Sequence, residues 1–156
     1  MKLVTEAVQS IGFTGTRFGM SLEQQQSLSL LLTTLVSRGY KRGHHGVCVG
    51  ADAQFHGYAK EREIYIIGHP GIRRDGKCFT RADVVCDETL PVKLFLDRDR
   101  DIVLASDVMI ATPQQFEEVF FGSGTWATYR FAKLHKKPLY LIMPDGRIEY
   151  ENGATE

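Results

Sequence analysis

Residues 108–144, VMIATPQQFEEVFFGSGTWATYRFAKLHKKPLYLIMP, contain the pattern from which the fold is predicted. Two apolar runs, VMIATP at 108–113 and PLYLIMP at 138–144, have the length and composition of buried strands. Between them, residues 123–137 are predicted to form a helix with Ala127, Phe131 and Leu134 on the face toward the sheet. A strand, a helix and a second strand in this order indicate a parallel pair joined by a crossover helix.

The rest of the chain repeats this alternation. Ser21 is predicted to cap a leucine-rich helix, and Gly39 is predicted to end it. The expected elements are a strand at 7–15, a helix at 21–39, a strand at 46–50, a helix at 51–62, a strand at 63–70, a long loop at 71–91 and a helix at 92–107. We therefore predict an α/β fold, with a mostly parallel sheet covered by helices on both faces.

Composition limits the class of protein. The chain has 156 residues and is 43% hydrophobic, enough for one domain with a proper core. We assign 1–146 to that domain and 147–156 to a polar tail that either holds a small strand or frays. Nineteen basic residues balance nineteen acidic ones, which argues against a DNA-binding protein that relies on a broad positive field. The leucine-rich helix carries more apolar residues than one sheet face needs, so we expect a homo-oligomer.

The N-terminal residues and the cysteines indicate a compartment. Residues 1–17 have neither the pattern of a signal peptide nor that of an anchor, and no segment is long enough to span a membrane. The three cysteines, Cys48, Cys78 and Cys86, are odd in number and lack CxxC spacing. We expect a reduced, cytoplasmic protein without disulfides, structural zinc or a membrane partner.

The loops that follow the strands are predicted to share one rim, because ligands of such sheets bind beyond the carboxyl ends of the strands. In the first loop, Gly15 lets the backbone approach a ligand and Arg17 offers a planar fork for phosphate or carboxylate. Two hydroxyls flank that glycine. The candidate ligand-binding residues here are Thr14, Gly15, Thr16 and Arg17, although a tight turn with a solvated arginine is also compatible with the sequence.

The second loop precedes the helix at 51–62. Gly50, Ala51, Asp52 and His56 are candidate ligand-binding residues. Asp52 and His56 are four residues apart and share a helix face, but no third ligand is evident, so we predict no metal. Asp52 either caps the helix or hydrogen-bonds a sugar hydroxyl, and His56 either packs or contacts the ligand. The preceding pair, His44 and His45, is expected at the entrance of a strand with a structural role.

Two further segments complete the predicted rim. In LDRDRD, Arg98 either belongs to a solvated helix face or turns inward to pair with a phosphate. After the strand at 108–113, two glycines precede a helix start, whose free amides and positive dipole end favour an anion. Trp126 is expected in the core. The candidate ligand-binding residues of this segment are Pro113, Gly122, Ser123, Gly124 and Thr125.

The order of these motifs resembles the SLOG superfamily, the Rossmann-like group that includes the LOG phosphoribohydrolases and the DNA-processing protein A fold. The resemblance covers roughly residues 8–146, and it is strongest to small phage or bacterial members with an SGTWATxR-type motif. It rests on GFTGTR, GADAQFHGYA, LDRDRDIVLASDVMIATP and GSGTWATYRFAKLHKKPLYLIMPDG. It implies a single Rossmann-like domain and a nucleotide or nucleotide-derived ligand, with several members serving in antiviral signalling.

The resemblance also implies roles for single residues. Gly124 and Thr125 match the GT of the LOG motif PGGxGTxxE, and Arg98 falls where LOG enzymes have their conserved arginine. Gly50 to Asp52 with His56 is similar to the GID…AH segment of the DNA-processing protein. Where LOG enzymes have a glutamate three residues after GT, this sequence has Thr128.

Three functions follow from the sequence. The first is binding of a phosphorylated nucleoside or nucleotide-derived signal, of the ADP-ribose-like or cyclic nucleotide class, as a sensor or sequestering protein without a further cofactor. The second is a nucleotide N-glycosidase, either a LOG-like phosphoribohydrolase or a deoxyribosyltransferase-like enzyme, with Glu117, Glu118 or Asp52 as candidate catalytic residues. The third is single-stranded DNA binding, for which the basic loop around Arg73 and Arg74 is the motif and zero net charge the counterargument.

Overall fold

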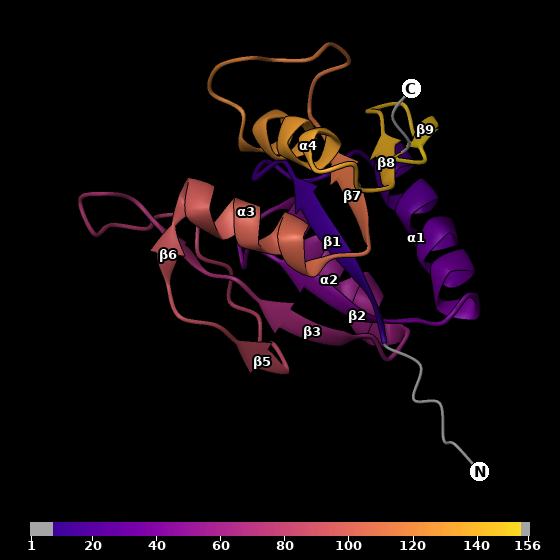
Figure 1. Cartoon of the computed structure of the whole chain (residues 1–156), viewed down its shortest axis with the longest axis horizontal. Helices are drawn as coiled ribbons and strands as arrows, with labels where there is room; N and C mark the ends of the chain where they lie inside the picture. The colour runs from indigo at the N-terminus through magenta and orange to yellow at the C-terminus, as the bar shows by residue number, and fades with distance from the viewer. Residues whose placement is uncertain (1–7, 154–156) are drawn as a thin grey trace.

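Seven strands form one sheet in the order β5-β3-β2-β1-β7-β8-β9, and all neighbours pair in parallel except the antiparallel pair β8 and β9 (Figure 1). The computed structural model describes residues 8–153. The strands are β1 (Gln9–Gly15), β2 (Tyr40–His45), β3 (Tyr65–Gly68), β5 (Glu88–Thr89), β7 (Val108–Thr112), β8 (Leu139–Ile142) and β9 (Ile148–Glu151). A separate parallel pair is formed by β4 (Gly71–Ile72) and β6 (Lys93–Leu94). The predicted α/β class with a mostly parallel sheet is confirmed.

The sequence predictions for the two ends of the chain fall partly on residues 1–7 and 154–156, which lie outside the described residues. These are the start of the first strand, the first seven residues of the segment at 1–17 that was judged for a signal peptide or anchor, and the end of the polar tail. Within that tail, Ile148–Glu151 forms β9 at the edge of the sheet. Across residues 8–153, no helix has both the length and the apolarity needed to cross a membrane.

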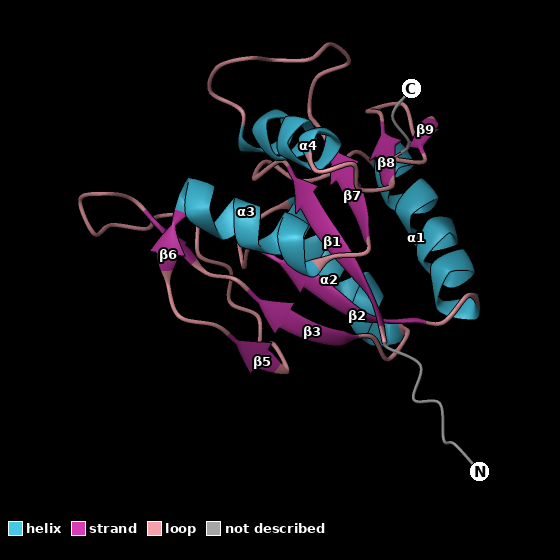
Figure 2. Cartoon of the chain, in the orientation of Figure 1, coloured by secondary structure: helices cyan, strands magenta, loops and turns pink. Residues whose placement is uncertain are grey.

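Four helices cover the two faces of the sheet (Figure 2). They are α1 (Leu22–Ser37), α2 (Ala51–Glu61), α3 (Phe95–Ala105) and α4 (Gly124–Leu134). Along β7, alternate side chains point to opposite faces, as strand geometry requires. Val108 and Ile110 pack in the core under α1 and α2, and Met109 and Ala111 pack in the core under α3 and α4. The helix pairs therefore bury two separate hydrophobic layers.

Helix α1 follows the sequence prediction closely. The Ser21 hydroxyl accepts a hydrogen bond from the Gln24 amide at 3.0 Å, and the Gln24 side chain accepts one from the Ser21 amide at 3.0 Å. Such a capping box satisfies two free amides at the helix start. Gly39, with φ of 96°, lets the chain leave the helix. Leu22 and Leu30 remain exposed, so this helix does carry apolar surface outside the core, and the expected oligomer stays a prediction.

The strand predicted at 46–50 is wrong, because the strand is Tyr40–His45 and residues 46–50 form the loop that follows it. The β-branched residues of GVCVG suggested an extended segment, but Val47 and Gly50 both have positive φ, which turns the chain. His44 and His45 consequently lie at the end of β2 and not at its entrance. The helix predicted at 92–107 is shorter, since Lys93–Leu94 forms β6.

The buried face of α4 also differs from the predicted one. Leu134 is exposed, and the face toward the sheet consists of Thr125, Trp126, Thr128, Tyr129 and Ala132. Trp126 lies in the core, as expected. The spacing of apolar residues predicted the wrong face because two threonines occupy core-facing positions. The Thr128 hydroxyl donates to the Gly124 carbonyl oxygen at 2.8 Å. A satisfied hydroxyl can be buried at modest cost.

The sheet reverses its winding direction at β1. The chain proceeds from β1 through β2 to β3 on one side, and then crosses to β7 and β8 on the other. In open α/β sheets, the loops at such a reversal leave a crevice at the carboxyl ends of the strands. The fold thus places the loops after β1 and β7 on the two sides of one opening.

Candidate functional site

A pocket of about 480 Å³ lies at this crevice. All four segments of the predicted rim contribute residues to its wall. Its volume is within the range of small-molecule sites, which is roughly 300–1,000 Å³. The lining residues from the sequence prediction are Thr14, Gly15, Thr16, Arg17, Asp52, Arg98, Gly122, Ser123, Gly124 and Thr125.

The loop after β1 presents a free cation to this pocket. The side chain of Arg17 is exposed, and it makes no ion pair with any residue in the described part of the chain. Its guanidinium lies 5.0 Å from the centre of the Phe18 ring. The Thr16 carbonyl oxygen accepts hydrogen bonds from the amides of Gly19 and Ala51, which fixes the backbone of the loop. The arginine therefore projects from a well-anchored turn.

Gly50 and Ala51 support that turn from behind and do not line the pocket. Gly50 has φ of 84°, and a Cβ atom there would lie 2.2 Å from the Arg17 carbonyl oxygen. Only glycine allows so close an approach of two backbones. These two predicted site residues thus shape the β1 loop from outside the pocket.

Asp52 fastens the loop after β2. Its Oδ2 atom accepts hydrogen bonds from the amides of Gly46 at 3.0 Å and Cys48 at 3.2 Å. It does not cap α2, since the cap residue is Gly50 and no side chain bonds to the helix start. Burial raises the pKa of Asp52 to about 6, against the opposing influence of the Arg98 charge. Its carboxyl group lies at the floor of the pocket.

Arg98 turns inward. This is one of the two alternatives predicted for LDRDRD, the other being a solvated helix face. The side chain is buried, and Nη1 donates to the carbonyl oxygens of Gly46 at 2.6 Å and His69 at 3.1 Å. Nε donates to Asp99 Oδ1 at 2.6 Å. The guanidinium is therefore occupied with holding three segments together, while it also lines the pocket.

The start of α4 forms the opposite wall. Ser123 caps the helix through a hydrogen bond from the Trp126 amide to its hydroxyl at 3.2 Å. The amides of Gly124 and Thr125 belong to the first helical turn, where no carbonyl precedes them to accept a bond. A Cβ atom at Gly124 would meet no protein atom within 4 Å, so the glycine leaves open space beside these amides. This wall suits an anion.

Asp99 is a site residue that the sequence analysis missed. It lines the pocket, and burial raises its pKa, while the Arg98 charge and the hydroxyl of Thr128 act in the opposite direction. Thr128, the residue at the LOG glutamate position, is itself buried beneath the helix start. A carboxylate from α3 thus lies beside the position where the resemblance implied one from α4.

Besides Gly50 and Ala51, four predicted residues lie outside the pocket wall. Glu117 is exposed, and Glu118 pairs with Arg130 at 3.1 Å. The Pro113 carbonyl oxygen accepts a hydrogen bond from the buried Gln24 side chain at 2.7 Å, which ties the end of β7 to α1. His56 lies on α2 and bonds to His45.

Two exposed phenylalanines, Phe18 and Phe79, also line the pocket. Phe79 comes from the long loop before β5, which runs beside the loop after β2. The Val49 amide donates to the Thr80 carbonyl oxygen, and the Ala82 amide donates to the Val47 carbonyl oxygen, each at 2.8 Å. Apolar rings exposed at a pocket are suited to stacking on a planar ligand.

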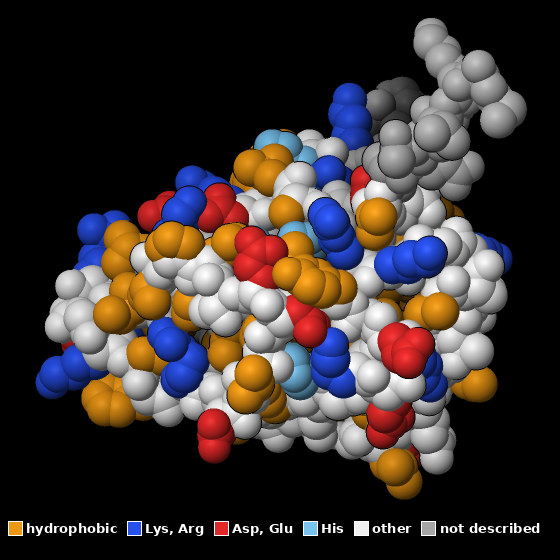
Figure 3. Space-filling model, turned by 90° about the horizontal axis from the view of Figure 1, so that it is seen from below, with side chains coloured by type: hydrophobic (Ala, Val, Ile, Leu, Met, Phe, Trp, Pro, Cys, Tyr) orange, Lys and Arg blue, Asp and Glu red, His pale blue; other side chains and the backbone are white. Residues whose placement is uncertain are grey.

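Charged side chains of both signs are interspersed on the face seen in Figure 3, without a continuous basic surface. Arg73 lines the pocket but pairs with Asp75 at 3.4 Å. A second cavity, of about 520 Å³, lies between the end of α4 and β9 and contains Lys133, Lys136 and Lys137. We favour the first pocket as the site, although it is slightly smaller, because it lies at the winding reversal and has buried polar groups.

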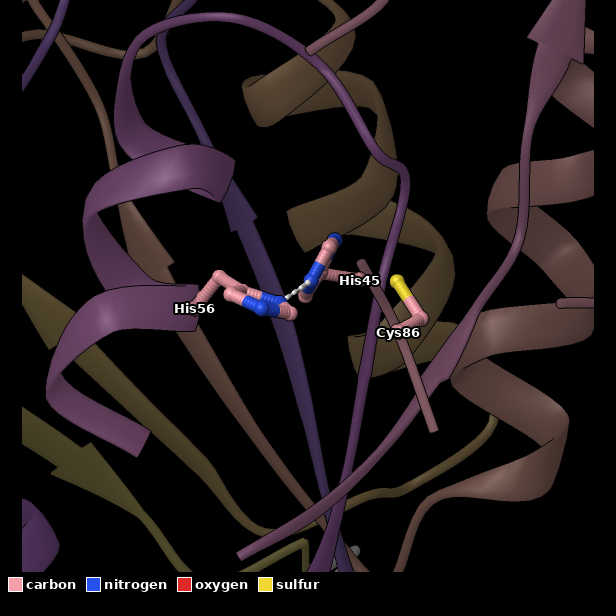
Figure 4. A group of neighbouring side chains, drawn as sticks. All are labelled: His45, His56 and Cys86. Atoms are coloured by element: carbon pink, nitrogen blue, oxygen red, sulfur yellow. Dashed lines mark hydrogen bonds between the residues drawn. The ribbon is translucent and has the colours of Figure 1, made fainter. Parts of the chain in front are cut away.

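Four of the five histidines form two buried pairs. His44 Nδ1 lies 2.8 Å from His69 Nε2, and His45 Nε2 lies 3.0 Å from His56 Nδ1. Burial lowers the pKa of His44 and His69 to about 4 and that of His45 to about 3, so these rings are neutral near pH 7. The ligand atoms of His45, His56 and Cys86 lie within 4.8 Å of one another, a grouping that sequence spacing did not reveal (Figure 4).

Comparison with known proteins identifies the class of fold. No family model matches the sequence, and a search of curated protein sequences gives no significant match. Among solved structures, the chain is similar to a molybdenum cofactor binding protein from Rippkaea orientalis, with TM-score 0.65, 24% identity, and coverage of 89% of this chain and 78% of that one. The shared fold is a Rossmann-like α/β fold with a mostly parallel sheet.

Two further solved structures have this fold. The molybdenum cofactor carrier protein of Chlamydomonas reinhardtii matches with TM-score 0.61 and 24% identity over 86% of this chain and 76% of that one. The structural-genomics target TM1055 matches with TM-score 0.52 and 17% identity over 84% and 72%. At these identities the likeness establishes the fold.

Proposed function

We propose that the protein binds a phosphorylated, nucleotide-like small molecule in the pocket at the carboxyl ends of the strands, and holds it as a sensor or sequestering protein. The observation that carries this proposal is the composition of the pocket wall. Arg17, a cation without an ion-pair partner in residues 8–153, and the free amides at the start of α4 line the same pocket. Both are groups that bind phosphate.

The proposed orientation follows from the polarity of the walls. The phosphate is held at Gly124 and Thr125, with Arg17 as its charge partner. The ring of the ligand stacks on Phe18 or Phe79, which are exposed at the pocket. Asp99 and the Thr14 and Thr16 hydroxyls are then available to ribose or other hydroxyl groups between the two ends.

The neighbours add one ligand to this class. Two of the similar structures are described as binding or carrying the molybdenum cofactor. The organic part of that cofactor is a phosphorylated pterin. This cofactor shares a planar heterocycle and a phosphate with nucleotides. The proposal therefore covers ADP-ribose-like compounds, cyclic nucleotides and phosphorylated pterins.

The test is calorimetric titration of the purified protein with AMP, ADP-ribose, cyclic AMP and a phosphorylated pterin, together with mass spectrometry of any small molecule released on denaturation. We expect one site per chain for at least one phosphorylated compound, and at least about tenfold weaker binding by Arg17→Gln, as befits a charged hydrogen-bond partner. Arg42→Gln is the control, since Arg42 is exposed on β2 and does not line the pocket. A protein free of ligand that binds none of these compounds contradicts the proposal.

A second candidate function is cleavage of an N-glycosidic bond, and the observation that favours it is Asp99. This carboxyl group lines the pocket and has a raised pKa, which suits a group that transfers protons. Release of free base from nucleoside monophosphates would support it, provided that Asp99→Asn abolishes the release and Glu117→Gln does not. If nucleoside monophosphates remain intact after prolonged incubation, cleavage is excluded and binding is the function that remains.

A further inference from the structure

We propose that His45, His56 and Cys86 form a binding site for a divalent transition metal ion of the zinc type, separate from the ligand pocket. The three residues come from the end of β2, from α2 and from the segment just before β5. None of them lines the pocket at the carboxyl ends of the strands. The proposal is independent of the function proposed above.

The geometry is close to what a tetrahedral site requires. Zinc binds histidine nitrogen at about 2.0–2.1 Å and cysteine sulfur at about 2.3 Å, so tetrahedral angles place two nitrogens about 3.3 Å apart and a nitrogen and a sulfur about 3.6 Å apart. His45 Nε2 and His56 Nδ1 are 3.0 Å apart, and all three ligand atoms lie within 4.8 Å of one another. Figure 4 shows the two imidazole rings directed at each other, with the Cys86 sulfur beside His45.

The neighbouring backbone prepares these positions. A Cβ atom at Gly68 would lie 2.7 Å from Cys86 Sγ, so the glycine at the end of β3 makes room for the thiol. The Val85 backbone hydrogen-bonds the His56 ring. A second partner of this kind orients a ligating histidine in known metal sites. Three protein ligands leave the fourth position to water, and half-buried Cys86 provides the side from which an ion enters.

Ligand chemistry selects the class of metal. Two imidazoles and a thiolate favour zinc, cobalt, nickel or copper, whereas calcium and magnesium prefer oxygen ligands. The nearest carboxylate on this segment, Asp87, is occupied, since it pairs with Lys60 at 2.6 Å and accepts a hydrogen bond from the Ile66 amide. The set is therefore two nitrogens and one sulfur.

Proton balance links the site to the loop after β2. His45 Nδ1 accepts a hydrogen bond from the Val47 amide at 3.0 Å, so the ring proton is on Nε2, which faces His56. Metal binding takes the Nε2 lone pair, the proton moves to Nδ1, and the Cys86 thiol releases its proton to solvent. The Val47 amide then loses its acceptor. Val47 precedes Cys48, whose amide donates to Asp52 Oδ2 at 3.2 Å.

The experiment is titration of the metal-free protein with Co²⁺, followed by absorption spectroscopy and displacement with Zn²⁺. We expect one Co²⁺ per chain, a thiolate-to-cobalt charge-transfer band, and loss of that band with at least about tenfold weaker binding in Cys86→Ser. Cys48→Ser and Cys78→Ser are matched controls that keep the band, and His56→Gln is a second variant that weakens binding should Cys86→Ser fail to fold.

The proposal is overturned if the folded wild-type protein does not bind Co²⁺ to saturation. It is also overturned if the charge-transfer band persists in Cys86→Ser. A band that disappears in Cys48→Ser and remains in Cys86→Ser places the thiolate elsewhere and overturns it as well. Arg17→Gln, which removes the proposed phosphate partner, is expected to bind Co²⁺ like the wild type. A failure to bind Co²⁺ and a failure to bind a nucleotide-type ligand are therefore distinguishable results.

Discussion

The guanidinium of Arg98 donates a hydrogen bond to the carbonyl oxygen of Gly46 at 2.6 Å, and this contact joins α3 to the loop after β2 at the floor of the pocket. The same group also satisfies the His69 carbonyl oxygen. A Cβ atom at Gly46 would lie 2.3 Å from Arg98 Nη1, so the glycine makes room for the guanidinium. The pocket floor depends on this buried cation.

Arg98→Met is therefore expected to lower the free energy of unfolding by about 3 kcal/mol, because two buried carbonyl groups and Asp99 lose their partner. Urea unfolding followed by circular dichroism measures the change. Arg100→Met is the control on the same helix, since Arg100 is exposed and its guanidinium lies over the Phe131 ring at 5.5 Å. We expect that control to change stability by less than about 1 kcal/mol. Equal effects of the two substitutions would refute the role given to Arg98.

Gly124→Leu is expected to weaken ligand binding by at least about tenfold without loss of stability. The space beside Gly124 is open, so a larger side chain folds there but obstructs the approach of a phosphate to the helix start. Gly57→Leu on α2 is the matched control, because a Cβ atom at Gly57 also meets open space and this residue lies outside the pocket. Calorimetry on both variants is decisive: equal ligand affinity in the two would exclude the helix start as the phosphate site.

Glu63→Gly is expected to raise the free energy of unfolding by about 1 kcal/mol. Glu63 follows α2 with φ of 58°, a conformation that costs a side-chain-bearing residue about 1–2 kcal/mol and glycine little. Its amide donates to the Lys60 carbonyl oxygen, and that bond survives the substitution. Thermal unfolding measures the gain, and Glu61→Gly inside the helix should instead reduce stability. A loss of stability in Glu63→Gly would contradict the prediction.

Stability is expected to fall as the pH is lowered from 7 to about 4.5. Burial lowers the pKa of His44 and His69 to about 4, so the unfolded chain takes up these protons near pH 6.5 and the folded protein does not. The stability due to these neutral rings is fully present above pH 6.5 and is lost as the pH falls toward 4. Asp52, whose pKa burial raises from 3.8 to about 6, acts in the opposite direction between those values.

The histidines outnumber Asp52, so we expect a net loss of at least about 2 kcal/mol over this interval, at about 1.4 kcal/mol per pKa unit. Urea unfolding at a series of pH values measures it. His69→Gln keeps a hydrogen-bonding side chain beside His44 but removes one titrating group, and its slope should be shallower. A stability that stays constant or rises on acidification would show that Asp52 dominates.

Much of the fold follows from the apolar runs, and the failures have identifiable physical reasons. β7 and β8 are apolar throughout because both faces of the sheet are covered, which makes them visible in the sequence. β2 is polar, since its buried end consists of histidines that satisfy each other in pairs with His69 and His56. The pairing partners are far apart in the chain, so no local sequence pattern predicts this strand.

The site, like the fold, was predicted in part and missed in part. The rule that ligands bind beyond the carboxyl ends of strands brought Arg17, Asp52, Arg98 and Gly124 to one pocket. Phe79 and Asp99 were missed because their positions depend on the path of the loop at 71–91 and on the rotation of α3. A charge run such as LDRDRD does not reveal which of its acidic groups lies inside.

The most direct test of the proposed binding site is a ¹⁵N–¹H NMR titration of the labelled protein with the phosphorylated compound that binds in calorimetry. We predict that the amides of Gly124, Thr125 and Arg17 shift with the calorimetric affinity, while those of Lys137 and Gly153 at the lysine-lined cavity do not. Shifts confined to Lys133, Lys136, Lys137 and Gly153, with Gly124 and Thr125 unmoved, would place the anion in that cavity and contradict the site proposed at the start of α4.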